Sequence, residues 1–159
     1  MFEPAGVEWS TVSARLASMR RAVLAAAVGA VALVAGIAVT RWLPQTYLGA
    51  VLVAAAGGFG WGWVWIGRNQ RSWGYTERAE DLLVRRGVMW RELVVVPYGR
   101  MQFVDVTRGP VERLFNLATV QLHTAAAATD ARIPGLEAAE AARLRDRLAA
   151  LGETRTAGL

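Results

Sequence analysis

Two groups of residues in this sequence have side chains that could do chemistry, and the first surrounds the single histidine. His123 lies in a stretch of alternating residues together with Thr119, and Asp105 lies in the stretch before it. A catalytic set needs a nucleophile, a base and an orienting group within hydrogen-bonding distance of one another. The spacing of these three residues indicates no such arrangement. We therefore interpret His123 as a solvated surface side chain.

The second group consists of Arg100, Arg108 and Arg113, which lie around one predicted strand and the turn that follows it. Guanidinium groups bind phosphate and carboxylate, so these three side chains could contact lipid headgroups or an acidic partner. Alternatively, they pair with Asp105 and Glu112 and hold the turn, each exposed pair contributing from a few tenths to about 1 kcal/mol. The sequence leaves both interpretations open.

The composition argues against several other kinds of site. The chain has no cysteine, which excludes disulfides, thiolate metal sites and cysteine nucleophiles, and one histidine cannot form a histidine-rich metal cluster. The glycine-rich stretch at residues 57–62 lies inside an apolar run, where a phosphate-binding loop is not expected. All 18 basic residues are arginines spread among 13 acidic ones, which argues against nucleic-acid binding. We expect no catalytic, cofactor-binding or metal-binding residues, and no enzymatic activity.

Two long apolar runs, at residues 22–40 and 47–66, precede the polar part of the chain. Neither run contains a charge. A helix rises about 1.5 Å per residue, so each run is close to the roughly 30 Å thickness of the hydrocarbon core. A segment in lipid must satisfy its own backbone hydrogen bonds, which favours helices. Residues 22–66 are therefore predicted to form a transmembrane hairpin with a short connector.

Arginines beside the two runs predict the orientation of the hairpin. The connector holds only Arg41, whereas the outer flanks hold Arg15, Arg20, Arg21, Arg68 and Arg71. By the positive-inside rule, both termini are expected in the cytoplasm and the protein in the inner cell membrane, as a multi-pass protein.

Residues 1–21 form the N-terminal cytoplasmic segment in this interpretation. Trp9, Val12, Leu16 and Met19 recur at spacings of three and four, which is typical of an amphipathic helix. The segment is therefore either an interfacial helix leading into the membrane or an irregular tail.

Small residues recur every four positions in the second run, at Ala54, Gly58 and Gly62. Small side chains let helix backbones approach closely in lipid, where apolar surface alone does not drive association. The first run carries a shorter stripe, formed by Ala25, Gly29, Ala32 and Gly36. The two stripes either pack on each other within the hairpin or contact another membrane protein or a second copy.

Residues 73–152 show the two-residue periodicity of an antiparallel β domain. We predict two short strands within residues 82–90 that turn at Gly87, and further strands at 92–97, 101–107 and 117–124. In the last strand, the residues expected to point inward are Ala118, Val120 and Leu122, and those expected to point outward are Thr119, Gln121 and His123.

Two helices are predicted within the same domain. A short helix at residues 110–115 is followed by Asn116, which suits a left-handed backbone position. A C-terminal helix at residues 136–151 begins with Glu137 and Glu140, carries a leucine stripe and stops at Gly152. Residues 153–159 are expected to be a loose tail.

Several segments of this domain resemble the bacterial PH-like domain of YdbS-type membrane proteins. The resemblance is carried by residues 84–88 (VRRGV), 96–106 (VPYGRMQFVDV), 108–115 (RGPVERLF), 117–120 (LATV) and 133–136 (IPGL). It implies an α+β membrane protein in which a two-helix transmembrane hairpin is followed by a PH-like split β-barrel capped by a C-terminal helix. Phosphoinositide-binding PH domains use a long basic loop between their first two strands. The corresponding hairpin here is short, so headgroup recognition is not carried over.

The sequence thus favours a non-enzymatic, membrane-anchored PH-like domain. Its expected role is that of an assembly or adaptor subunit that contacts another membrane protein or itself. The alternative is binding of anionic lipid headgroups by the PH-like domain. The expected partners are the lipid bilayer and a membrane protein or homo-oligomer, with no nucleic acid.

Overall fold

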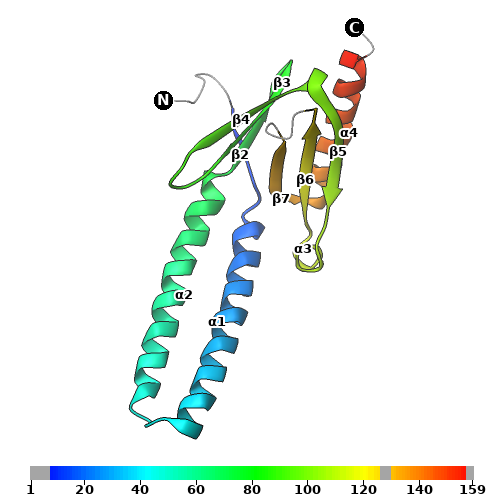
Figure 1. The fold of residues 1–159 in the computed structure, drawn as a ribbon. Coiled ribbons are helices and arrows are strands. Elements are labelled where there is room, and N and C mark those ends of the chain that lie inside the picture. Colours follow the sequence, from blue (N-terminus) through cyan, green and yellow to red (C-terminus); the bar gives the residue numbers. More distant parts are fainter. Residues whose placement is uncertain (1–7, 126–129, 157–159) are drawn as a thin grey trace. The chain divides into compact units, whose positions relative to one another are not determined.

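The computed structural model describes residues 8–125 and 130–156, which form two compact units (Figure 1). The helical unit comprises residues 17–68. The other unit, called the PH-like unit after the resemblance given above, comprises the described residues on either side of it, 8–16 and 69–156.

The helical unit is made of α1 (Arg15–Trp42) and α2 (Tyr47–Ser72), except that the first two residues of α1 and the last four of α2 belong to the other unit. Both helices are long and apolar enough to cross a membrane, and only 6% of the residues in the most apolar stretch of each are buried. The core helix of a soluble protein would be mostly buried, so this exposure favours a lipid environment. The connector is a tight turn, in which Pro44 and Gln45 accept hydrogen bonds from the first amides of α2. The predicted hairpin is confirmed.

The first sheet of the PH-like unit has four antiparallel strands in the order β1-β2-β3-β4. These are β1 (Ser10–Thr11), β2 (Gly74–Glu77), β3 (Asp81–Arg86) and β4 (Glu92–Pro97). The strand at 92–97 is as predicted. Val88–Trp90 is not the strand that we predicted, because Gly87 has φ of 104° and opens a wide turn that ends only at Glu92.

Residues 8–14, before α1, do not form an interfacial helix, which was one of the two alternatives in the sequence analysis. Ser10 and Thr11 pair with Tyr75 and Gly74 as a strand, and the helix begins only at Arg15. Val12 and Leu16, two residues of the amphipathic pattern, are buried. Because both lie in the PH-like unit, their apolar side chains fill its core instead of facing lipid. Residues 1–7 lie outside the described residues.

The second sheet has the order β5-β6-β7, again antiparallel. Its strands are β5 (Met101–Thr107), β6 (Leu117–Thr124) and β7 (Ala131–Glu137); the 3-10 helix η1 (Tyr98–Arg100) precedes β5 and α3 (Pro110–Leu114) connects β5 to β6. β5, β6 and α3 lie where they are predicted, and Asn116 has the expected left-handed backbone, with φ of 54°.

The C-terminal helix α4 (Ala138–Thr156) is displaced from its predicted position at both ends. Its first predicted residues belong to β7, so that Glu137 ends a strand. At the other end the helix continues through Gly152, and residues 153–156 are helical instead of a loose tail. A glycine inside a helix costs only about 1 kcal/mol relative to alanine, which packing can outweigh.

The core of the PH-like unit lies between the sheets and α4, which runs along the second sheet (Figure 1). Leu144 and Leu148 of α4 are fully buried. So are the strand residues Leu82, Val96, Leu117, Val120, Leu122 and Ile133, together with Tyr98 of η1. The Tyr98 hydroxyl donates a hydrogen bond to the carbonyl oxygen of Arg78 at 3.0 Å, which satisfies the polar end of this buried ring.

Candidate functional site

The turn around α3 is held by a carboxylate that the sequence suggested as an ion-pair partner. Glu112 accepts a hydrogen bond from the Gly109 amide at 2.7 Å and another from the Thr119 hydroxyl at 2.8 Å. It therefore caps the helix instead of pairing with arginine. Thr119, predicted to point outward, is fully buried because this contact covers its side of β6.

The three candidate arginines do not form one cluster. Arg108 donates from Nε to the Leu117 carbonyl oxygen at 3.1 Å and from Nη2 to the Asn116 side chain at 3.3 Å. Arg113 is exposed on α3. Arg100 precedes β5, whereas Arg108 follows it, and the seven residues of that strand span roughly 20 Å. Arg108 and Arg113 are thus neighbours in the chain around α3, and Arg100 lies at the opposite end of the sheet.

His123 has partners that the sequence did not indicate. Its ring stacks on Phe103 with centroids 4.4 Å apart, and Nδ1 lies 3.2 Å from an oxygen of Asp130. The other Asp130 oxygen accepts the Thr124 amide at 2.8 Å, and this bond, with the contact to His123, holds the pKa of Asp130 below its ordinary value. Asp105 lies opposite Gln121, between Thr119 and His123 in the strand register, but Thr119 binds Glu112 and His123 contacts Asp130. No hydrogen bond within the described part of the chain therefore joins the three residues considered for catalysis.

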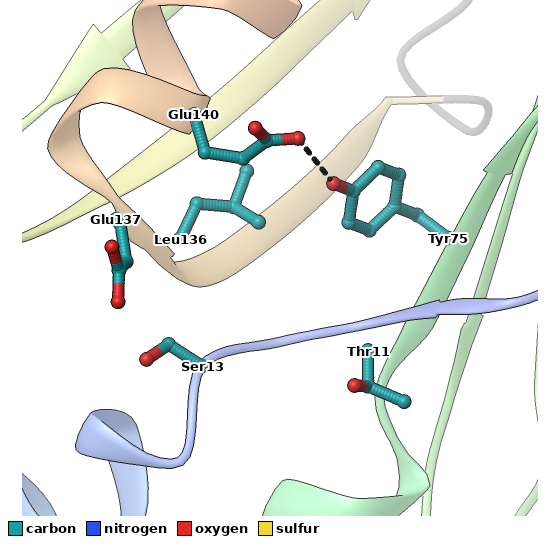
Figure 2. Close-up of a pocket in the computed structure, with 6 residues that line it drawn as sticks. All are labelled: Thr11, Ser13, Tyr75, Leu136, Glu137 and Glu140. Atoms are coloured by element: carbon teal, nitrogen blue, oxygen red, sulfur yellow. Dashed lines mark hydrogen bonds between the residues drawn. The ribbon is translucent and has the colours of Figure 1, made fainter.

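The PH-like unit has a cleft of about 330 Å³, which could not be predicted because its lining residues lie far apart in the sequence. Figure 2 shows its lining, formed by Thr11, Ser13, Tyr75, Leu136, Glu137 and Glu140, which come from three separate parts of the chain. The Tyr75 hydroxyl donates to Glu140 at 3.0 Å, and Arg143 also binds Glu140. Glu137 lies 3.4 Å from Arg15. Glu137 and Glu140 both have partners, so these carboxylates connect segments of the fold and neither is free to act as an acid or a base.

We expect this cleft to make stability sensitive to alkaline pH. Burial, followed by the hydrogen bond to Glu140, raises the pKa of Tyr75 from 10.0 to about 12. Because the folded pKa is the higher one, the protonated ring contributes stability that is complete below pH 10 and lost as pH rises towards 12. The loss should be on the order of 1–2 kcal/mol.

This prediction can be checked by urea unfolding in detergent between pH 9 and 12, a range in which tyrosine is the main titrating side chain because the sequence lacks lysine and cysteine. Tyr75→Phe should lose less stability on alkalinisation than the wild type. Burial also raises the pKa of Tyr98, so a smaller dependence of stability on pH should remain in this variant. An unchanged slope in Tyr75→Phe would contradict the prediction.

The small-residue stripe of α2 divides between two faces. At Gly62, an added Cβ would lie 2.7 Å from Cδ2 of Leu24, so this glycine accommodates α1. Ala54 and Gly58 are exposed, and Gly58 has nothing within 4 Å. Gly29 and Gly36 of the other stripe also face open space. The interpretation that the stripes pack fully on each other is therefore wrong.

The geometry of the helix explains this division. Each residue turns the helix by about 100°, so a step of four residues overshoots a full turn by about 40°. Within residues 47–66, the half-buried positions of α2 are Leu48, Val51, Ala55, Phe59, Gly62 and Ile66, which follow one another at steps of three or four. A series with steps of four only drifts off that face, so Ala54 and Gly58 are exposed although Gly62 is half-buried.

Comparisons with known proteins agree with this architecture. Residues 13–152 match the family described as bacterial PH domain. The transmembrane protein YdbS of Bacillus subtilis (strain 168) is 40% identical over 79 residues, which are 50% of this chain and 48% of YdbS. The match thus spans about half the length of this relative. No solved structure matches the chain. Because the family match runs from the segment before α1 into α4, the chain belongs to the bacterial PH domain family, as a member with two apolar helices long enough to cross a membrane.

Proposed function

We propose that this protein is a non-catalytic, membrane-anchored PH-like module that acts as an assembly or adaptor subunit. The observation that carries the proposal is the exposed face of α2 at Ala54 and Gly58, which α1 does not use. A small-residue face gives a second helix the close backbone approach that association in lipid requires. The expected occupant is a helix of another membrane protein or of a second copy.

The distribution of arginine supports a cytoplasmic position for the PH-like unit. Arg15, Arg20 and Arg21 precede the first apolar run and Arg68 and Arg71 follow the second, whereas the connector has Arg41 alone. With both ends in the cytoplasm, the PH-like unit is held at the inner surface of the cell membrane. It would there present its surface to a cytoplasmic or membrane partner.

Leucine substitutions in α2 test the adaptor function. Gly58→Leu should leave the hairpin intact, because a Cβ added at Gly58 would have no neighbouring atom of another element within 4 Å. The leucine should reduce association with the partner helix several-fold. Gly57→Leu is the matched control, since Gly57 also faces open space but lies off the stripe. Gly62→Leu should instead disturb the packing of α1 on α2 through Leu24.

Association can be measured by disulfide cross-linking of a cysteine placed at Gln45 in the connector, since the chain has no cysteine of its own. Co-purification of other membrane proteins with each variant measures association with a different protein. Loss in Gly58→Leu but not in Gly57→Leu supports the proposal. If neither cross-linking nor recovery changes in Gly58→Leu, this face contacts lipid only.

The alternative function is binding of anionic lipid headgroups by the PH-like unit. It is favoured by the exposed guanidinium of Arg113, which forms no ion pair among the described residues. It differs from the adaptor function in needing lipid alone. This alternative would be favoured if the PH-like unit of the purified protein contacts the lipid of anionic vesicles with no other protein present.

A further inference from the structure

One end of the PH-like unit is marked by the two points at which the chain passes to and from the helical unit. The chain leaves the PH-like unit after Leu16 and returns to it at Asn69. Three contacts hold these points together: Thr11 pairs with Gly74, Gln70 donates to the Val12 carbonyl oxygen at 3.1 Å, and the Ser13 amide donates to the Gly135 carbonyl oxygen at 3.0 Å.

The strand register places two loops at this same end. Gly74 begins β2 and lies opposite Arg85, so the turn from Gly87 to Arg91, here called the β3–β4 tip, projects beyond it. In the second sheet, Glu137 contacts Arg15 at the start of α1 and lies opposite Leu117. α3 immediately precedes Leu117, so it lies at this end as well.

The β3–β4 tip and α3 both expose large apolar side chains. Trp90 is 86% exposed and Met89 is 82% exposed at the β3–β4 tip, and Leu114 of α3 is 83% exposed. Val111 of α3 is exposed too. Scattered exposed apolar residues are ordinary, but these four gather on the two loops at one end. Tryptophan in particular is favoured at the boundary between hydrocarbon and water.

The charges at this end favour an anionic surface. Arg91 and Arg113 are exposed and form no ion pair among the described residues. The acidic groups here are already engaged: Glu92 binds Arg86 at 2.9 and 3.0 Å, Glu112 caps α3, and Glu137 lies by Arg15. The opposite end carries the acidic residues Glu80, Asp81 and Asp130 together with Arg78 and Arg100.

We propose that the β3–β4 tip and α3 form a bilayer-contact surface, with Met89, Trp90, Val111 and Leu114 in the lipid interface and Arg91 and Arg113 at the phosphates. The occupant is the membrane crossed by α1 and α2, because the chain enters and leaves the PH-like unit at this end. This inference deepens the lipid-binding alternative by naming the surface, and it is independent of any partner of α2. Each arginine near an anionic leaflet contributes roughly 1 kcal/mol.

Single-cysteine variants test this surface in the full-length protein, since no native cysteine interferes. Trp90→Cys and Leu114→Cys carry a nitroxide label, and Arg100→Cys at the opposite end is the control. In vesicles of phosphatidylcholine and phosphatidylglycerol, collision rates with oxygen and with a water-soluble nickel complex report immersion. We expect an oxygen-to-nickel ratio several-fold higher at positions 90 and 114 than at position 100.

Vesicles of phosphatidylcholine alone separate the two contributions. If the labels at positions 90 and 114 are immersed in both kinds of vesicle, the bilayer-contact surface is supported and its apolar side chains make the larger contribution. If they are immersed only in anionic vesicles, the surface is supported and the arginines make the larger contribution. Ratios at 90 and 114 equal to that at 100 in both would overturn the inference. So would low accessibility to both reagents, since a protein contact would then cover the surface. A negative result in this experiment does not affect the cross-linking result for Gly58→Leu, so each proposal can be rejected without the other.

Discussion

Replacing Gly135 with alanine is expected to destabilise the PH-like unit by about 2–5 kcal/mol. Gly135 has φ of 72°, a left-handed conformation that costs a side chain about 1–2 kcal/mol. An added Cβ would also lie 2.7 Å from both Cβ and Cδ2 of Leu16. The Cβ of Leu16 cannot rotate away, so backbone must move, which typically costs a further 1–3 kcal/mol.

Gly99→Ala is the matched control, because Gly99 has no positive φ and nothing within 4 Å of its added Cβ. Urea unfolding in detergent should show a clear loss for Gly135→Ala and almost none for Gly99→Ala. Hydrogen exchange should also quicken at the Ser13 amide, which donates to the Gly135 carbonyl oxygen. Equal unfolding midpoints for the two variants would mean that the start of α1 is not docked at Gly135.

Leu144→Ala is expected to cost about 2–5 kcal/mol, the usual range for truncating a fully buried leucine. Leu144 has no exposed surface and lies on the face of α4 that contacts the second sheet. Its loss leaves a cavity that rigid strands fill only in part. Leu114→Ala, the same change at an 83% exposed position, should leave the unfolding midpoint in detergent unchanged. Comparable losses in both variants would contradict the packing of α4 described above.

The parts of the fold that depend on local pattern could be predicted from the sequence. The apolar runs, β5, β6 and α3 depend on composition and periodicity within a few residues, and Asn116 on its own backbone preference. β1 has only two residues and its partner lies beyond both long helices, so no local signal reveals it. β7 contains Pro134 and Gly135, which interrupt the pattern of a strand, and the sequence predicts helix for its last two residues, Leu136 and Glu137.

The candidate site was harder to predict because it depends on which ends of the strands meet. Three arginines within fourteen positions suggest one patch, yet the seven-residue strand β5 separates Arg100 from the other two. Burial of Thr119 depends on Glu112, a contact made by the turn and not by the strand itself. The exposure of Met89 and Trp90 depends on where the strand after Gly87 begins, which the sequence analysis placed too early.

The pairing of β1 with β2 has a consequence for how the protein is made. A growing chain produces Ser10 before either long helix and Tyr75 after both, yet the finished sheet joins the two. That junction can form only when the helices return the chain to the side of the bilayer from which it started. A chain that inserted one helix alone would leave the two strands on opposite sides, and the sheet would lack its first strand. For a chain whose two helices both cross the bilayer, the complete first sheet therefore requires both crossings.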